Sequence, residues 1–236
     1  MDSKNRDYFV SRGEKIRRQK KTKKVILLMI LFLLLGLLIA YLVTSVFYNQ
    51  GQFSISLDRN LYLNRGILLY DKSDYKVYQS ELVAPTVDYF DNIRSTWLPN
   101  NLDYDEAGSH NGENYVAYTW YIENLGDDTS DFWTDLVVDD VVKNIDEAIR
   151  VRVYKNGVAE TYAKRSRLTG GNEAGTIAFQ SNELIKRGHV ENFRPGDKIR
   201  YTIVFWLEGT DPDCTDALLG GEIKMHMEFN SEFVDK

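Results

Sequence analysis

The sequence has little cysteine, proline or histidine: one cysteine (Cys214), four prolines and three histidines among 236 residues. A single cysteine excludes a disulfide within the chain, so the fold must be stabilised by its apolar core. The roughly 186 residues that follow position 50 are enough for one domain that buries about 70% of its unfolded surface. The chain also has no excess of basic residues: 29 Lys and Arg against 35 Asp and Glu give a net charge of -6.

That charge is distributed very unevenly along the chain. Residues 1–24 carry a net charge of +7, residues 25–50 carry no charged side chain, and residues 51–236 carry a net charge of -13. Phosphate recognition requires a positive surface. The acidic segment is therefore not expected to have nucleic acid as a partner.

Residues 25–47 form the longest apolar run. These 23 residues include no charged residue, Asn, Gln or Pro, and seventeen of them are Leu, Ile, Val or Phe. As a helix they would extend about 34 Å, enough to cross a hydrocarbon core of about 30 Å. Seventeen large apolar side chains give an insertion free energy on the order of -5 to -10 kcal/mol. We predict one transmembrane helix, with the lipid bilayer as its partner.

A cleaved signal peptide is the alternative for this run. Signal peptides usually have an apolar region of about 7–15 residues and an A-x-A-like cleavage site, whereas here residues 43–48 read VTSVFY. An uncleaved signal anchor is therefore favoured. Because an excess of Lys and Arg marks the cytoplasmic side, residues 1–24 are predicted to be a basic cytoplasmic tail. Residues 51–236 are then an extracytoplasmic domain of a single-pass cell-membrane protein.

Alternation of apolar and polar residues predicts strands in that domain. Asn156-Gly157 predicts a tight hairpin turn, and Pro195-Gly196-Asp197 predicts another turn. Residues 139–148 fit either a helix or a strand followed by a turn. With no alternation of strands and helices, we expect an all-β fold, an antiparallel β-sandwich. The predicted strands are 53–57, 114–124, 150–154, 198–207 and 223–229.

Motifs for catalysis are missing from the sequence. It contains no H-E-x-x-H, G-x-S-x-G, P-loop or G-x-G-x-x-G pattern. His110, His189 and His226 lie far apart, and the acidic neighbours of Cys214 should raise the pKa of its thiol. We expect no catalytic or cofactor-binding residue, and a protein that is not an enzyme.

Four carboxylates follow the strand expected at 198–207: Glu208, Asp211, Asp213 and Asp216. Carboxylates this close repel one another unless they are solvated, hydrogen-bonded or neutralised by a cation. A Ca²⁺ site is one hypothesis, although the spacing does not match the EF-hand loop. The alternative is an acidic surface loop in which Asp213 caps a short helix. No other cofactor is expected.

Four segments of the domain form a recognisable set: 51–58 (GQFSISLD), 114–127 (NYVAYTWYIENLGD), 201–214 (YTIVFWLEGTDPDC) and 220–229 (GGEIKMHMEF). Together they resemble the camelysin and TasA-type proteins of Gram-positive cell surfaces. The resemblance implies a jelly-roll-like β-sandwich that is exported. In some members it is assembled into matrix fibres, in which an N-terminal strand completes a neighbour's sheet. A retained anchor would restrict such strand donation here, and no metal-ligand motif supports the metallopeptidase activity attributed to camelysin-like proteins.

We therefore expect a membrane-anchored cell-surface protein whose β-sandwich serves binding or matrix assembly without catalysis. Its partners would be other surface or matrix proteins, or further copies of itself. One alternative is a secreted biofilm-matrix fibre subunit, released by signal cleavage. Others are a surface metallopeptidase of the camelysin type and an accessory to cell-envelope enzymes.

Overall fold

The computed structural model describes Arg17, Lys21 and residues 23–42, 53–87, 89, 91–103 and 108–233. The chain divides into two compact units, residues 1–49 and residues 50–236.

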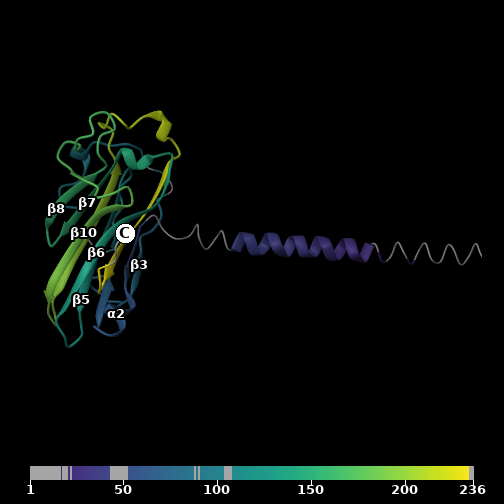
Figure 1. The fold of residues 1–236 in the computed structure, drawn as a ribbon, viewed down its shortest axis with the longest axis horizontal. Helices are drawn as coiled ribbons and strands as arrows, with labels where there is room; N and C mark the ends of the chain where they lie inside the picture. Colours follow the sequence, from purple (N-terminus) through teal and green to yellow (C-terminus); the bar gives the residue numbers. More distant parts are fainter. Residues whose placement is uncertain are drawn as a thin grey trace, which may run out of the picture. The chain divides into compact units, whose positions relative to one another are not determined.

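The first unit contains the helix Lys23–Leu42, drawn in purple in Figure 1. Its mean hydropathy is 3.1, and none of its residues is buried. A helix of 20 residues spans about 30 Å. It is thus long and apolar enough to cross a membrane, a property that signal sequences near an N-terminus share. Residues 43–47 of the predicted span, and nearly all of the predicted tail, lie outside the described residues.

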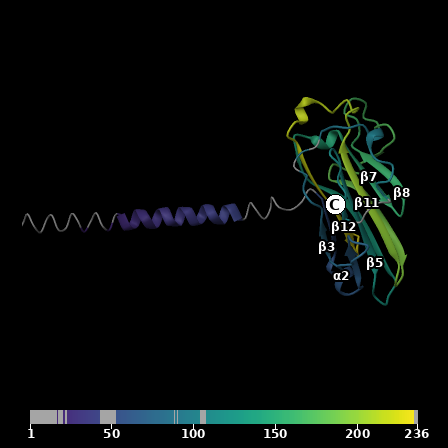
Figure 2. The ribbon, with the colours of Figure 1, turned by 180° about the vertical axis from the view of Figure 1, so that it is seen from behind.

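The second unit is built from two β-sheets, seen from opposite sides in Figures 1 and 2. The five-stranded sheet has the order β10-β6-β12-β1-β3, and the seven-stranded sheet has the order β2-β5-β11-β7-β8-β9, with β4 paired to β5. The first sheet comprises β10 (Leu184–Phe193), β6 (Ser130–Val142), β12 (Glu222–Asn230), β1 (Phe53–Leu57) and β3 (Glu81–Val83). The second comprises β2 (Ile67–Tyr70), β5 (Val116–Asn124), β11 (Lys198–Leu207), β7 (Ile149–Lys155), β8 (Val158–Ala163), β9 (Ile177–Ala178) and β4 (Gly108–Ser109).

Short helices lie in the connections between strands. The α-helix α2 (Arg59–Leu63) follows β1, and the Asp58 carboxylate caps it by accepting from the Leu61 backbone N–H at 2.6 Å. Three 3₁₀ turns complete the described elements: η1 (Ser95–Trp97), η2 (Ile145–Glu147) and η3 (Asp216–Leu218).

The predicted β-rich, sandwich-like fold is confirmed, but the sheets are mixed, so the prediction that the sandwich is antiparallel is correct only in part. The strand β1 runs parallel to β12, with Phe53 opposite Met225 and Leu57 opposite Phe229, and β8 runs parallel to β9. The strands β1 and β12 come from opposite ends of the domain sequence, so no hairpin turn fixes their relative direction. The jelly-roll connectivity stays a prediction.

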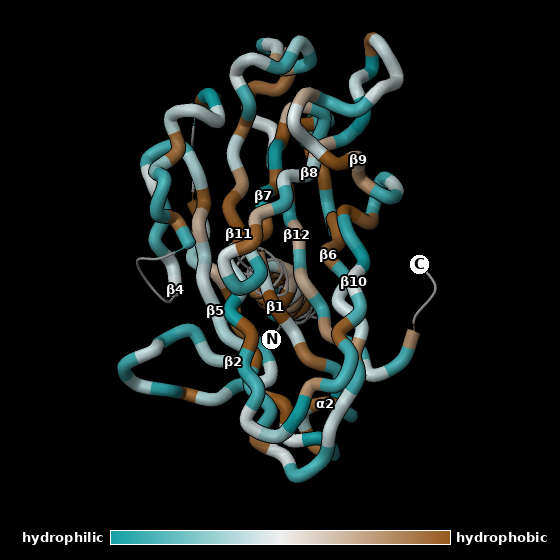
Figure 3. The backbone as a smooth tube through the Cα atoms, turned by 90° about the vertical axis from the view of Figure 1, so that its left-hand side faces the viewer, coloured by the Kyte–Doolittle hydropathy of each residue, from teal (hydrophilic) through white to brown (hydrophobic). Residues whose placement is uncertain are grey.

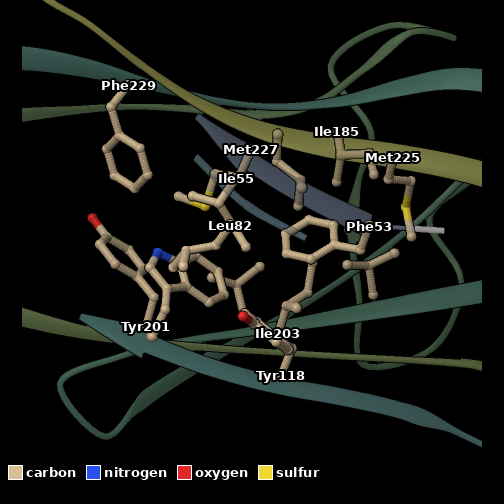
Figure 4. Close-up of a cluster of buried hydrophobic side chains, with 14 of the residues drawn as sticks. Phe53, Ile55, Leu82, Tyr118, Ile185, Tyr201, Ile203, Met225, Met227 and Phe229 are labelled. Carbon is tan, nitrogen blue, oxygen red and sulfur yellow. The ribbon is translucent and has the colours of Figure 1, made fainter. Parts of the chain in front are cut away.

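The main core lies between the two sheets. Figure 4 shows Phe53, Met227 and Phe229 of the five-stranded sheet meeting Tyr201 and other side chains of the seven-stranded sheet. The Tyr201 and Phe229 rings are packed edge to face, with centroids 5.7 Å apart. Each large apolar side chain buried in this layer contributes about 1.5–3 kcal/mol, so the core can hold the domain without a disulfide.

A second, smaller apolar cluster covers the outer face of the seven-stranded sheet. Ile93, Leu98 and Leu102, from the segment after β3, pack with Val204 and Trp206 of β11. Figure 3 shows in brown the hydrophobic stretches of β11 and β7. Both faces of β11 are therefore buried, which explains its nearly continuous apolar sequence.

Most predicted elements are confirmed. The five expected strands correspond to β1, β5, β7, β11 and β12. Asn156 and Gly157 have positive φ angles of 49° and 88°, as the predicted hairpin turn between β7 and β8 requires. In residues 139–148 the strand-then-turn alternative is correct, because β6 continues to Val142 and η2 follows.

Candidate functional site

The acidic segment 208–216 follows β11, and its first carboxylate is held by hydrogen bonds from this chain. Glu208 is 6% exposed. It accepts hydrogen bonds from Trp206 Nε1 at 3.0 Å, from the Ser95 backbone N–H at 3.0 Å and from Thr210 Oγ1 at 2.6 Å. Burial opposes ionisation of Glu208, but the hydrogen bonds from Thr210 and Trp206 lower its pKa. Glu208 thus connects the end of β11 to η1.

The second carboxylate forms a buried ion pair. The Asp211 side chain is fully buried, and its Oδ2 lies 2.5 Å from Arg150 Nη2. Its Oδ1 accepts from the Asp213 backbone N–H at 2.8 Å. Arg150 Nη2 also lies 3.6 Å from Glu173 Oε2. One guanidinium from β7 therefore compensates two carboxylates that come from separate loops.

Asp213 lies at the edge of this group. Its Oδ2 accepts a hydrogen bond from the Arg167 backbone N–H at 3.3 Å. The proposed capping role of Asp213 is wrong, because η3 begins at Asp216 and its N-cap residue is Thr215, without a side-chain capping bond. Asp216 opens η3 and is exposed.

Three carboxylates of this region meet closely enough to share a cation. Ligand oxygens of Glu173, Asp211 and Asp213 lie within 4.8 Å of one another, a group that includes neither Glu208 nor Asp216. Glu173 Oε1 is buried and has no hydrogen-bond partner among the described residues. The structure therefore brings together two of the four carboxylates named from the sequence and adds Glu173.

The charge of this group is already partly balanced from within the chain. The Arg150 guanidinium contacts two of these three carboxylates, Glu173 and Asp211. Ca²⁺ takes six to eight oxygen ligands at about 2.3–2.6 Å, so an ion here would have to share Asp211 with Arg150. The Ca²⁺ site stays a prediction. A calcium-dependent rise in melting temperature that Asp211→Asn and Asp213→Asn abolish would support it, and no rise in the intact chain would end it.

Arg150 and Glu173 are the residues that sequence reasoning missed here. The alternation around Arg150 predicts a side chain in water, whereas Arg150 is 5% exposed. Glu173 lies in an irregular segment of mixed charge. Since Arg150 and Asp211 are 61 positions apart, no local pattern could have paired them.

The three histidines are each engaged locally. The His110 ring nitrogens lie 3.1 Å from the Gly108 carbonyl oxygen and 3.0 Å from the Leu102 carbonyl oxygen. The His189 ring stacks on Trp133, with centroids 4.2 Å apart. None of the three joins the carboxylate group among the described residues.

His226 has the most perturbed histidine environment. Its Nδ1 lies 2.7 Å from Asp139 Oδ1, and its Nε2 lies 3.6 Å from Glu228 Oε2. The hydrogen bond to Asp139, with that to Glu228, raises the pKa of His226 to about 9. His226 is therefore protonated at neutral pH and acts as a cation in this cluster.

The thiol of Cys214 is not activated. Burial raises its pKa, and the nearby carboxylates of Asp211 and Glu208 raise it further. The sequence correctly predicted that the pKa of this thiol is raised. It attributed the rise to the flanking Asp213 and Asp216, whereas the main cause is burial, followed by the carboxylates of Asp211 and Glu208.

Comparisons with known proteins leave the class of protein open. No family model and no curated protein matches the sequence. The fold search returned a GH31 alpha-xylosidase from Xanthomonas citri, with a TM-score of 0.27, 12% identity, 70% of this chain covered and 18% of that one. It also returned a beta-glucosidase from Kluyveromyces marxianus in complex with glucose, with a TM-score of 0.24, 10% identity, 72% of this chain covered and 15% of that one. The chain spans less than a fifth of either enzyme, and likenesses this weak carry no argument.

Proposed function

We propose that this chain is a single-pass membrane protein whose β-sandwich acts outside the cytoplasm as a binding or assembly module, without catalysis. The observation that carries the proposal is the helix Lys23–Leu42, with a mean hydropathy of 3.1, placed ahead of a separate β-rich unit. The charge distribution agrees with the proposed orientation: the segment before the helix is basic, as is typical of the cytoplasmic side, and the domain after it is acidic.

The polar clusters at the end of β11 are paired within the domain, which supports a structural role for them. Arg150 pairs with Asp211, and Glu208 accepts from Trp206 and Thr210. Such pairs hold loops against the sheet. This arrangement favours a module that presents a stable surface, and matrix or surface proteins, including further copies of this chain, are its proposed partners. The jelly-roll connectivity and the relation to camelysin and TasA-type proteins belong to the same proposal.

A cysteine-labelling experiment tests the orientation. In a Cys214→Ser background, Ser73→Cys places a thiol at an exposed position of the domain, and Ser11→Cys places one in the basic segment. The account predicts that a membrane-impermeant maleimide labels the Ser73→Cys variant in intact cells, and labels the Ser11→Cys variant only after the membrane is permeabilised. The reverse pattern would place the domain in the cytoplasm and end the proposal.

A further inference from the structure

At one edge of the sandwich, polar side chains occupy positions that face the apolar core. Along β7, Val151 and Val153 face the core, and by strand alternation the next core-facing position is Lys155. Along β6, the position after the core residue Phe132 on the same face is Thr134. Polar residues at core-facing positions destabilise a fold, and natural proteins tolerate them mainly at functional sites. These positions therefore call for a separate explanation.

A cavity of about 180 Å³ lies at this edge, between β6 and β10 of one sheet and β7 and β11 of the other. Gly188 helps to keep it open, because a Cβ atom there would lie 2.7 Å from Thr134 Oγ1. An apolar cavity of about 150 Å³ holds benzene, so this one, open at its rim, has room for about seven non-hydrogen atoms inside. Its lining includes Thr134, Lys155, Lys186, Gly188, Tyr201 and Met227.

Two hydroxyl groups of the lining lack protein partners. Tyr201 is 3% exposed and Thr134 is 5% exposed, and neither hydroxyl forms a hydrogen bond within the described part of the chain. Figure 4 shows the Tyr201 side chain reaching between the sheets toward Phe229. Burial raises the pKa of Tyr201, so its hydroxyl stays protonated and available as a donor. Neither hydroxyl is fully shielded from solvent, so each can exchange water in the cavity for a ligand oxygen.

The charges beside the cavity are unbalanced. Lys186 donates to the Glu160 carboxylate, which also accepts from the Tyr162 hydroxyl at 2.5 Å. Lys155 forms no ion pair with a described residue, and burial together with the Lys186 ammonium lowers its pKa. Two ammonium groups thus share one carboxylate. The cavity has an unpaired positive charge at its rim and apolar surface from Met227 inside.

We propose that this cavity binds a small organic monocarboxylate with a short apolar chain. The carboxylate is recognised by the Lys155 ammonium and by the hydroxyls of Tyr201 and Thr134, while the chain packs against Met227. A charge-assisted hydrogen bond in a partly buried site gives such a ligand its orientation, and the apolar lining selects for the hydrocarbon body. This goes beyond the proposed function, which names no ligand and does not depend on this cavity.

Titration of the full chain in lipid nanodiscs with hexanoate tests the proposal. Binding is followed by the methyl NMR signal of Met227, and the signal of Met29, in the apolar helix, reports partitioning into lipid. Hexanoate should move the Met227 signal in a saturable way, and hexan-1-ol should bind at least about tenfold more weakly because it cannot form the charged contact. Lys155→Gln should weaken hexanoate binding at least about tenfold. The matched control Lys198→Gln removes an exposed lysine of β11 that lies over Tyr121 and should leave binding unchanged.

Thr134→Val provides a second variant that keeps the shape of the side chain and removes one hydroxyl. It should weaken hexanoate binding about fivefold. No movement of the Met227 signal with hexanoate in the millimolar range would overturn the proposal. So would equal binding of hexanoate and hexan-1-ol, or unchanged affinity in both the Lys155 and the Thr134 variants. None of these results bears on whether the chain is anchored in a membrane.

Discussion

Removal of the buried guanidinium of Arg150 should be among the most destabilising single changes around the carboxylates of Glu173, Asp211 and Asp213. In Arg150→Met, Asp211 loses its 2.5 Å contact and Glu173 loses its 3.6 Å contact. The Asp211 side chain is fully buried, so water cannot replace the lost partner. Breaking a buried ion pair by removing one partner costs about 3–5 kcal/mol.

The loss can be measured by urea unfolding of the full chain in nanodiscs, followed by tryptophan fluorescence. Trp206 is 1% exposed and reports the packing of β11. For a domain of this size, about 3–5 kcal/mol corresponds to a fall in melting temperature of about 6–20 °C. Arg167→Met is the matched control. The Arg167 side chain is 66% exposed and 4.0 Å from Asp213, so its loss should change stability by less than about 0.5 kcal/mol.

A double-mutant cycle separates the ion pair from simple loss of packing. Asp211→Asn should cost less in the Arg150→Met background than in the natural chain, with a coupling energy of about 1 kcal/mol or more. The contrary results are a cost of less than about 1 kcal/mol for Arg150→Met, or additivity of the two changes. Either result would mean that the guanidinium does not compensate the carboxylates of this cluster.

Two further predictions concern the turn after β5 and the outer face of β12. Gly126→Ala should lower the free energy of unfolding by about 1–3 kcal/mol, because a Cβ atom would lie 2.1 Å from the Arg65 carbonyl oxygen. The control Gly171→Ala should change it little, because the nearest atom to its Cβ would be the Thr169 hydroxyl oxygen, at 3.5 Å. Equal chemical-denaturation midpoints for these two variants would contradict the close approach. His226 should titrate with a pKa near 9 by NMR, and Asp139→Asn should lower that value. Because the folded-state pKa lies above the ordinary value of 6.5, the stability from this cation is complete below pH 6.5 and is lost as the pH rises through about 9. The corresponding fall in unfolding free energy should disappear in His226→Gln, and an unchanged fall would show that another group causes it.

The fold could be predicted where local sequence decides it. Alternation located β1 and β7, and the Asn156-Gly157 turn was recognisable because few residues adopt positive φ angles. Strand direction could not be predicted for β1, since its partner β12 lies at the far end of the chain. The longest strand, β6, was considered only at its C-terminal end, where a strand was one of two alternatives for residues 139–148. Its acidic residues interrupt the apolar alternation, and one of them, Asp135, is buried by pairing with Arg187.

The candidate sites were less predictable for the same reason. The acidic segment was visible because its carboxylates are close in sequence, but its counter-ion Arg150 is contributed by another strand. The alternation of charged and apolar residues in β7 normally marks a face in water. Here the segment that contains Ile93 and Leu98 covers the outer face of the seven-stranded sheet, which sequence alone does not reveal. The cavity between the sheets is lined by residues of five strands, β6, β7, β10, β11 and β12, and was likewise beyond local patterns.

Tethering of the domain by the apolar helix Lys23–Leu42 separates the proposed membrane protein from a secreted one. The most direct measurement is the N-terminal sequence of the mature protein, determined together with its distribution between membrane and soluble fractions. The account predicts a membrane-bound protein that retains the basic segment before the helix. A soluble or released protein that begins near residues 46–52 would contradict it and would favour a secreted subunit instead.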